Sequence, residues 1–233
     1  GEIVSVVGES GSGKSISALM SMGLLSQSAS VSFTKATVLE NEIGQLSPAQ
    51  WRAIRGKEIA MIFQDPMTAL HPSMRIGKQM EEVLEVHTDF NSAQRKACVI
   101  AALDEVDIPN ALLSAKKYPH ELSGGQRQRV GIARAIALEP KIIVCDESVS
   151  ALDISVQAQI LNLLNTLKDN FGFTYIFISH DLSVVQYMSD QLLVMQNGRL
   201  VEIGDADEIY AMPKSQYTKS LIGAIPKGIS KPK

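Results

Sequence analysis

The stretch GESGSGKS, residues 8–15, constrains the fold more than any other part of the chain. It follows the apolar run EIVSVV, residues 2–7, which is typical of a strand, and it precedes a run with helical spacing over residues 16–25. A strand, a glycine-rich loop and a helix in this order form the context that a phosphate-binding loop requires. The glycines allow a tight turn that brings backbone N–H groups close to a phosphate chain, and the N-terminus of the helix adds further donors. A chance turn rich in glycine and serine is the alternative, and the full pattern in its context favours phosphate binding.

All eight residues of this loop are candidate nucleotide-binding residues: Gly8, Glu9, Ser10, Gly11, Ser12, Gly13, Lys14 and Ser15. Lys14 is expected to reach the β- and γ-phosphates, and the Ser15 hydroxyl is expected to ligate Mg²⁺. The loop therefore predicts a nucleoside triphosphate, and the other motifs must indicate what that nucleotide drives.

The size and charge of the chain exclude several classes of protein. Its 233 residues can bury a sizeable core, which fits one α/β domain with an insertion. A net charge of −3 lacks the basic footprint of a nucleic-acid binder. No apolar run approaches the roughly 20 residues that span a bilayer, so a role at a membrane must come through a partner. The two cysteines, Cys98 and Cys145, predict no disulfide framework and no metal cluster, and Cys145 is expected to be a buried free thiol.

Strand-like and helix-like segments alternate along the chain, which predicts an α/β domain with a mainly parallel sheet. Strands are expected at residues 2–7, 58–63, 141–145 and 174–178, with short edge strands at 31–33 and 37–39. Helices are expected at residues 16–25, 48–55 with Ser47 as the N-cap, 76–88, 92–106, 130–138, 155–170, 206–211 and 216–223. Asn197 and Gly198 predict a type I′ hairpin between residues 191–195 and 199–203. The tail from Pro226 is expected to be frayed, and the start at Gly1, one residue before a strand, suggests a piece of a longer polypeptide.

The segment QDPMTALHPSM, residues 64–74, contains two prolines and is expected to be a loop. It carries three apolar side chains, Met67, Leu70 and Met74. These side chains either lie in the core or form an exposed docking surface for a partner, and the sequence leaves both interpretations open.

The segment LSGGQRQR, residues 122–129, leads into the helix that is expected over residues 130–138. Ser123 is a candidate N-cap, and Gly124 and Gly125 allow the backbone to approach an anion at the start of the helix. The segment is therefore either a second helix N-terminus that faces a phosphate or simply a capped helix.

Two carboxylates, Asp146 and Glu147, follow the apolar run at residues 141–145. A continuous apolar run indicates a strand buried on both faces, and open α/β sheets bind ligands at the carboxyl ends of such strands. Asp146 is expected to hold Mg²⁺ through its water shell, and Glu147 is expected to orient or deprotonate the attacking water. Because adjacent residues of a strand point to opposite faces, the two carboxylates are expected to have distinct roles.

His180 ends the strand region at residues 174–178, beside the expected nucleotide, which favours a phosphate contact. A lone histidine is more often structural. His71, His87 and His120 have no partners at metal-ligand spacing and are interpreted as structural.

Taken in order, these motifs resemble those of the ATP-binding-cassette ATPases, and the resemblance covers essentially the whole chain. The matching motifs are Walker A at residues 8–15, the Q-loop glutamine Gln64, the LSGGQ signature at 122–126, Walker B with the catalytic glutamate at 142–147, the D-loop at 150–153 and the switch histidine His180. LSGGQ together with Walker A is highly specific to this family. The resemblance implies an α/β P-loop NTPase fold of the RecA-like type, with a mainly parallel sheet, an inserted helical subdomain and an incomplete N-terminal antiparallel β part.

The same resemblance implies one nucleotide-binding domain over residues 1–233. Its core would comprise residues 1–65 and 139–204, its helical subdomain about residues 66–138, and its C-terminal helical segment residues 205–233. Glu147, His180 and Gln64 would be catalytic, while Ser15, Gln64 and Asp146 would hold Mg²⁺. The signature residues that would bind ATP are Ser123, Gly124, Gly125 and Gln126.

In this family two cassettes face head to tail, and each ATP lies between the Walker A of one and the LSGGQ of the other. The implied partner is a second ABC ATPase subunit, in a homodimer or a heterodimer, so a single chain would hydrolyse ATP poorly. Gln64 would report the nucleotide state to the loop after it, and that loop with the helical insertion would grip transmembrane permease subunits. A substrate-binding protein would be an indirect partner, no nucleic acid is expected, and the chain would lie peripherally at the cytoplasmic face of the inner membrane.

Four stretches resemble the ATPase subunits of the oligopeptide, dipeptide and nickel importers more narrowly. They are FQDPMTALHPSM, SALDISVQAQILNLL, FISHDLSVV and YTKSLIGAIP. Those importers have two related ATPases, sometimes fused in one polypeptide, and this chain carries stretches like each of them. The implied function is ATP hydrolysis that powers import of peptides or nickel. The transported substrate stays open, since selectivity in these importers resides in the binding protein and the permease.

The chain departs from the family pattern in two places. The aromatic residue that stacks on adenine in the family lies in a strand before Walker A, which would precede Gly1. Ser148 stands where the family usually has proline, and we expect this change to be tolerated because Asp146 and Glu147 are intact.

Two other functions compete with transport. A soluble cassette protein of translation or DNA maintenance usually carries two cassettes or a long coiled-coil insertion, and neither is visible in this sequence. A non-catalytic module that binds nucleotide and regulates a partner is the second alternative, and the intact Glu147 and His180 argue against it.

Overall fold

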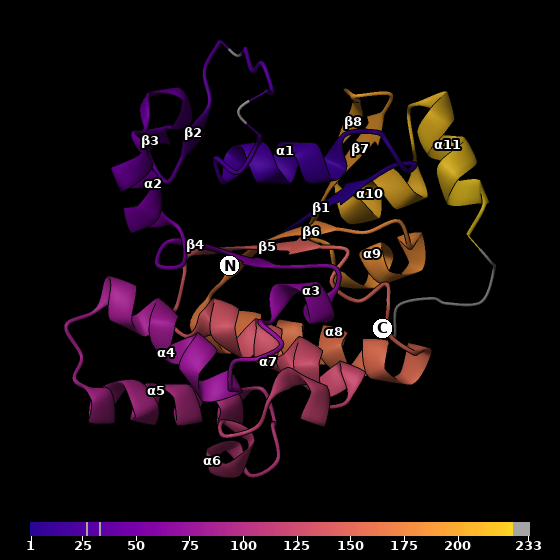
Figure 1. Cartoon of the computed structure of the whole chain (residues 1–233). Coiled ribbons are helices and arrows are strands. Elements are labelled where there is room, and N and C mark those ends of the chain that lie inside the picture. Colours follow the sequence, from indigo (N-terminus) through magenta and orange to yellow (C-terminus); the bar gives the residue numbers. More distant parts are fainter. Residues whose placement is uncertain (27, 33, 226–233) are drawn as a thin grey trace.

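The computed structural model describes residues 1–26, 28–32 and 34–225, and a six-stranded sheet lies at its centre between two layers of helices (Figure 1). The six strands are β1 (Ile3–Val7), β4 (Ile59–Ile62), β5 (Ile142–Asp146), β6 (Thr174–Ile178), β7 (Gln191–Gln196) and β8 (Arg199–Asp205). Their order across the sheet is β4-β5-β6-β1-β7-β8, and every neighbouring pair is parallel except β7 and β8. The prediction of an α/β fold with a mainly parallel sheet is confirmed.

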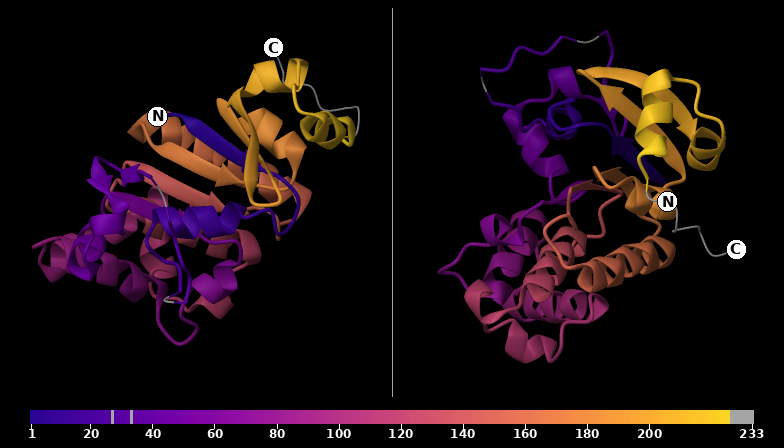
Figure 2. Two further views of the ribbon diagram at one scale, coloured as in Figure 1. Left: turned by 90° about the horizontal axis from the view of Figure 1, so that it is seen from above. Right: turned by 90° about the vertical axis from the view of Figure 1, so that its right-hand side faces the viewer.

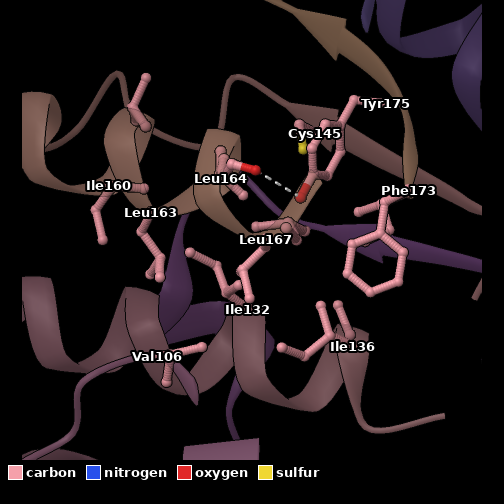
Figure 3. Packing of buried hydrophobic residues seen from close by; sticks show 14 of the residues in the cluster. Val106, Ile132, Ile136, Cys145, Ile160, Leu163, Leu164, Leu167, Phe173 and Tyr175 are labelled. Atoms are coloured by element: carbon pink, nitrogen blue, oxygen red, sulfur yellow. Dashed lines mark hydrogen bonds between the residues drawn. The ribbon is translucent and has the colours of Figure 1, made fainter. Parts of the chain in front are cut away.

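Each face of the sheet buries its own hydrophobic cluster, because alternate residues of a strand point to opposite faces. In β5, Ile143 and Cys145 lie in the larger cluster, whereas Val144 lies in the smaller cluster with α1 (Lys14–Ser21). The larger cluster fills the space between the sheet and the helices α7 (Gly124–Ile136) and α8 (Ile154–Phe171), as Figure 3 shows. Within it, the hydroxyl of Tyr175 donates a hydrogen bond of 3.1 Å to the carbonyl of Leu164.

The remaining helices lie on both sides of the six-stranded sheet (Figure 2). They are α2 (Pro48–Ile54), α3 (Pro66–Ala69), α4 (Ile76–His87), α5 (Ser92–Glu105), α6 (Ala111–Ser114), α9 (Leu182–Met188), α10 (Ala206–Ala211) and α11 (Gln216–Gly223), with 3₁₀ turns at Ile43–Gln45 and Pro119–Glu121. Helices α4, α5 and α7 pack against one another below the sheet. The division into a core, a helical subdomain and a C-terminal segment stays a prediction. Within the described ranges, none of the helices has both the length and the apolar character needed to cross a bilayer.

The prediction of a loop over residues 64–74 is wrong in part, because Pro66–Ala69 form the short helix α3. The side chain of Asp65 accepts a hydrogen bond of 2.8 Å from the backbone N–H of Met67 and so caps this helix. The backbone N–H groups of the first helical turn have no partner within the helix, so a proline at this position removes no helical hydrogen bond. Pro66 therefore begins a helix instead of breaking one. Each of the two interpretations of the apolar side chains in this segment holds for one residue. Leu70 is buried in the core, whereas 48% of Met67 is exposed and could contact a partner.

Several other boundaries differ from the predictions. Helix α1 begins two residues earlier than expected and ends at Ser21, and helix α7 begins at Gly124, six residues before its expected start. A two-stranded antiparallel sheet joins β2 (Thr37–Val38) to β3 (Asn41–Glu42), while Val31 lies outside any strand. Phe33 and the tail from Pro226 lie outside the described residues.

The hairpin prediction is confirmed. Gln196 pairs with Arg199 across a two-residue turn, and both turn residues, Asn197 and Gly198, have positive φ. This combination is the one that a type I′ turn requires.

Candidate nucleotide-binding site

The sheet order brings the glycine loop and the predicted catalytic residues to one edge. The glycine loop follows β1, Gln64 follows β4, Asp146 ends β5 and His180 follows β6. These four strands are parallel neighbours in the sheet, so their carboxyl ends lie side by side. Segments that are far apart in the sequence therefore meet around the loop.

The glycine loop is tightly packed at its start. Gly8 has a φ of +150°, and a Cβ at this position would lie 2.1 Å from the carbonyl oxygen of Met195 in β7. Any larger side chain would force the loop away from β7. This close approach explains why glycine stands at the first position of the loop.

Lys14 is buried, and its ammonium is held by the loop itself. Its Nζ donates hydrogen bonds of 2.9 Å to the carbonyl of Gly8 and of 2.9 Å to the carbonyl of Glu9. An ammonium has three N–H donors, so one donor remains for another acceptor. The loop thus presents a positive charge from a fixed position.

Ser15 and Asp146 lie next to each other at the start of α1 and the end of β5. The hydroxyl of Ser15 donates a hydrogen bond of 2.9 Å to Oδ1 of Asp146. Burial raises the pKa of Asp146, the negative charge of Glu147 raises it further, and the Ser15 hydrogen bond and the charge of Lys14 act in the opposite direction. A hydroxyl and a carboxylate are the hard oxygen ligands that Mg²⁺ prefers, so these residues fit the predicted cation.

The three predicted catalytic side chains meet at one carboxylate oxygen. Oε2 of Glu147 accepts a hydrogen bond of 3.1 Å from Nε2 of Gln64 and lies 3.4 Å from Nδ1 of His180. A hollow of about 150 Å³ is lined by Glu147, by Ile16 of α1 and by five residues of the loop: Ser10, Gly11, Gly13, Lys14 and Ser15. The carboxylate and the phosphate-binding loop therefore face the same space.

Asp146 and Glu147 are not neighbours within one strand, so strand alternation does not set their directions. Strand β5 ends at Asp146, and Glu147 has a φ of +47°. The backbone turns at this point, and the N–H of Glu147 donates a hydrogen bond of 3.0 Å to the carbonyl of Ile178 at the end of β6. The turn, and not the pleat of a strand, sets the direction of the Glu147 side chain.

The signature residues form a separate site. Ser123 and Gln126 make a reciprocal capping box, in which the Ser123 hydroxyl accepts from the Gln126 N–H at 3.3 Å and the Gln126 side chain accepts from the Ser123 N–H at 3.1 Å. Gly124 and Gly125 line, with these two residues and Ala151–Asp153, a hollow of about 320 Å³. This hollow shares no lining residue with the one at the glycine loop. The structure therefore does not bring the signature and the glycine loop of one chain together.

Two contacts at the loop were not predicted from the sequence. The N–H of Gly198, in the β7–β8 turn, donates to the carbonyl of Ser12 at 3.1 Å. The N–H of Glu9 donates to the hydroxyl of Tyr217, in α11, at 3.1 Å. About 190 to 210 positions separate the partners, and no local pattern indicates such pairs; the family-like stretch YTKSLIGAIP was the only sequence signal near Tyr217.

The prediction that Cys145 is a buried free thiol is confirmed. Cys145 is a free thiol, is fully buried in the larger hydrophobic cluster, and burial raises its pKa to about 12. Such a thiol remains protonated near neutral pH and does not act as a nucleophile.

Comparisons with known proteins agree with this geometry. The sequence profile of the family described as ABC transporter matches residues 1–150. The chain belongs to the ABC transporter family. It is consequently an ATP-hydrolysing cassette, as the assembled loop, carboxylates and histidine indicate.

Several curated relatives of this cassette are named for transport of peptides. It is 44% identical over 227 residues to the oligopeptide transport ATP-binding protein OppD of Salmonella typhimurium. This match covers 97% of this chain and 68% of OppD. It is 46% identical over 230 residues to OppF of Escherichia coli, over 97% of this chain and 66% of that protein. It is 42% identical over 235 residues to the glutathione import ATP-binding protein GsiA of Escherichia coli, over 97% of this chain and 37% of that protein. The chain thus spans about two thirds of OppD and OppF, and the soluble non-transport alternative is not favoured.

Solved structures of cassettes share the fold. A dimeric, post-hydrolysis structure of the ATP-binding cassette MJ0796 with ADP and Pi has a TM-score of 0.75 and 26% identity, and the match covers 88% of this chain and 85% of that one. The cassette cbiO1 of Clostridium perfringens, part of the complex cbiONQ, has a TM-score of 0.76 and 27% identity, over 91% of this chain and 80% of that one. The fold prediction is therefore confirmed.

Proposed function

We propose that this cassette hydrolyses Mg-ATP to power a membrane importer for peptides. The observation that carries the proposal is the meeting of Lys14, Gln64, Glu147 and His180 at one sheet edge. The resemblance to OppD, OppF and GsiA, two named for oligopeptide transport and one for glutathione import, supports peptides as the substrate class.

The proposed chemistry is positioning and electrostatic stabilisation. The loop N–H groups and Lys14 bind the phosphates, and Ser15, Asp146 and Gln64 hold Mg²⁺, which offsets phosphate charge when it is bound. Glu147 orients or deprotonates the attacking water. Gln64 and His180 both lie against Oε2 of the Glu147 carboxylate and hold it in place, and His180 also contacts the γ-phosphate.

The proposed assembly contains two cassettes. Ser123, Gly124, Gly125 and Gln126 line a hollow that is separate from the glycine loop, so they serve an ATP that is bound to a second chain. The cassette MJ0796, which shares the fold, is dimeric in its solved structures. The second cassette is either an identical copy or a related subunit.

The remaining proposed partners are transmembrane permease subunits and, through them, a substrate-binding protein. Two exposed apolar side chains flank Gln64: Phe63 before it, 40% exposed, and Met67 in the loop after it, 48% exposed. This surface suits a permease contact. The proposed location is the cytoplasmic face of the inner membrane, as a peripheral subunit.

The first experiment measures ATP-dependent dimerisation of Glu147→Gln by light scattering, with Mg-ATP and without nucleotide. This variant keeps the shape of the side chain and loses the carboxylate, so we expect it to bind ATP, dimerise and release almost no phosphate. Phosphate release at the wild-type rate would rule out Glu147 as the key group. A monomer that binds ATP would assign the second site to a related subunit.

Peptide transport is tested separately. Uptake of a radiolabelled tripeptide is compared in cells that carry the wild-type chain and in cells that carry Glu147→Gln. We expect uptake to be lost in the variant, whereas equal uptake in both strains would contradict the proposal.

A further inference from the structure

The C-terminal helix α11 contacts the phosphate-binding loop through a hydrogen bond that the motifs above do not explain. The backbone N–H of Glu9 donates to the hydroxyl of Tyr217 at 3.1 Å, across 208 positions of sequence. Tyr217 opens the stretch YTKSLIGAIP, for which the proposed chemistry has no role. Figure 1 shows α11 beside the start of α1, where the loop ends.

The geometry of one peptide group links this hydrogen bond to Lys14. The N–H of Glu9 and the carbonyl of Gly8 belong to the same planar peptide, so neither can turn without the other. That carbonyl accepts from Nζ of Lys14 at 2.9 Å. The Tyr217 hydroxyl therefore holds, from outside the loop, the peptide that positions the ammonium.

The direction of the ammonium matters because two of its three donors are already used. They go to the carbonyls of Gly8 and Glu9, each at 2.9 Å. The third donor remains for a phosphate oxygen in the hollow that Lys14 lines. A rotation of the Gly8–Glu9 peptide would change the direction of all three.

Helix α11 is well placed to hold this peptide because its own start is fixed. The carboxylate of Glu202, in β8, accepts from the N–H groups of Lys214 at 2.7 Å and Ser215 at 3.1 Å. Thr218, the residue after Tyr217, is fully buried. Beside this contact lies a cavity of about 540 Å³ between α11 and the segment 180–183, so side-chain packing does not fill that side of the loop.

We propose that Tyr217 is a positioning residue for ATP binding, which acts through the Gly8–Glu9 peptide on Lys14. The proposal rests on the nucleotide-binding role of the glycine loop. It assigns to the C-terminal helix a function in the affinity for nucleotide, beyond packing.

The test is Tyr217→Phe, which removes the hydroxyl and keeps the ring. We expect the Kd for Mg-ATP, measured by titration calorimetry, to rise about threefold to tenfold, as for the loss of one hydrogen bond. The KM for ATP should rise by the same factor while kcat at saturating ATP stays unchanged, because the lost contact acts on binding alone. Inorganic tripolyphosphate should lose affinity to the same extent, because the effect reaches the phosphates and not the base.

Tyr187→Phe is the matched control. The hydroxyl of Tyr187 donates to Oδ1 of Asn162 at 2.8 Å, between α9 and α8 and away from the loop. This variant should bind ATP as the wild type does. A rise in Kd equal to that of Tyr217→Phe would overturn the proposal, since the effect would then be general to the loss of a tyrosine hydroxyl.

A double variant tests whether Tyr217 acts through Lys14. In a Lys14→Met background, Tyr217→Phe should weaken ATP binding no further, because the group that it positions is gone. A further tenfold loss in that background, or a normal Kd for Tyr217→Phe alone, would overturn the proposal. Equal ATP binding by the wild type and Lys14→Met would instead refute the nucleotide-binding role of the loop itself, so the two failures are distinguishable.

Discussion

Replacing Lys14 by methionine tests the phosphate-binding loop most directly. Methionine keeps an unbranched apolar stem in the buried position of Lys14 and removes only the ammonium. That ammonium donates to the carbonyls of Gly8 and Glu9 at 2.9 Å, which leaves its third donor for one charge-assisted bond to a phosphate. Such a bond contributes about 1.5–3 kcal/mol, which corresponds to about a 10- to 150-fold loss of affinity for ATP.

The assay is titration calorimetry with Mg-ATP, together with the thermal unfolding midpoint without nucleotide. We expect the midpoint to change little, since the desolvation cost of the buried ammonium disappears together with its two hydrogen bonds. Lys96→Met, which removes an exposed charge from α5, is the control and should bind ATP normally. Unchanged affinity for ATP in Lys14→Met would exclude a phosphate contact by the Lys14 ammonium, and a large fall of the unfolding midpoint would make Lys14 a structural residue.

Three further predictions concern packing, protonation and reactivity. Gly125→Ala would place a Cβ 2.8 Å from a valine of α8 and should lower the free energy of unfolding by about 1–3 kcal/mol. Gly124→Ala, where the Cβ faces open space, should leave the free energy of unfolding unchanged. Equal melting temperatures of the two variants would contradict this prediction. Because burial raises the pKa of Asp146, the ionised form costs stability, and this cost grows as the pH rises through the raised pKa. Asp146→Asn should therefore raise the Mg²⁺-free melting point more at pH 7 than at pH 4, and an equal shift at both would count against the burial argument. Cys145, whose pKa burial raises to about 12, should resist iodoacetamide at pH 8 in the native chain while the half-buried Cys98 reacts, which mass spectrometry of the labelled peptides would decide.

Local features of the site could be read from the sequence because they depend on residues close together in the chain. The glycine loop between a strand and a helix, the Ser123 cap and the Asn197-Gly198 turn all have the expected form. The errors also arose locally, where one residue type has two uses. Pro66 begins a helix that its presence was expected to prevent, and Glu147 leaves the strand through a positive φ that residues other than glycine uncommonly adopt.

Hydrophobic periodicity and turn chemistry act over a few residues. The α/β class, the parallel strands and the groups that would face a nucleotide could therefore be inferred from the amino-acid sequence. Which of these groups meet depends on the tertiary fold. The strand order puts Gln64, Glu147 and His180 around one carboxylate oxygen, leaves Ser123 in a separate hollow, and brings Tyr217 to the loop from the other end of the chain. Contacts between residues far apart in the sequence depend on how strands and helices pack on one another. The side-chain pattern within a single segment does not predict that packing.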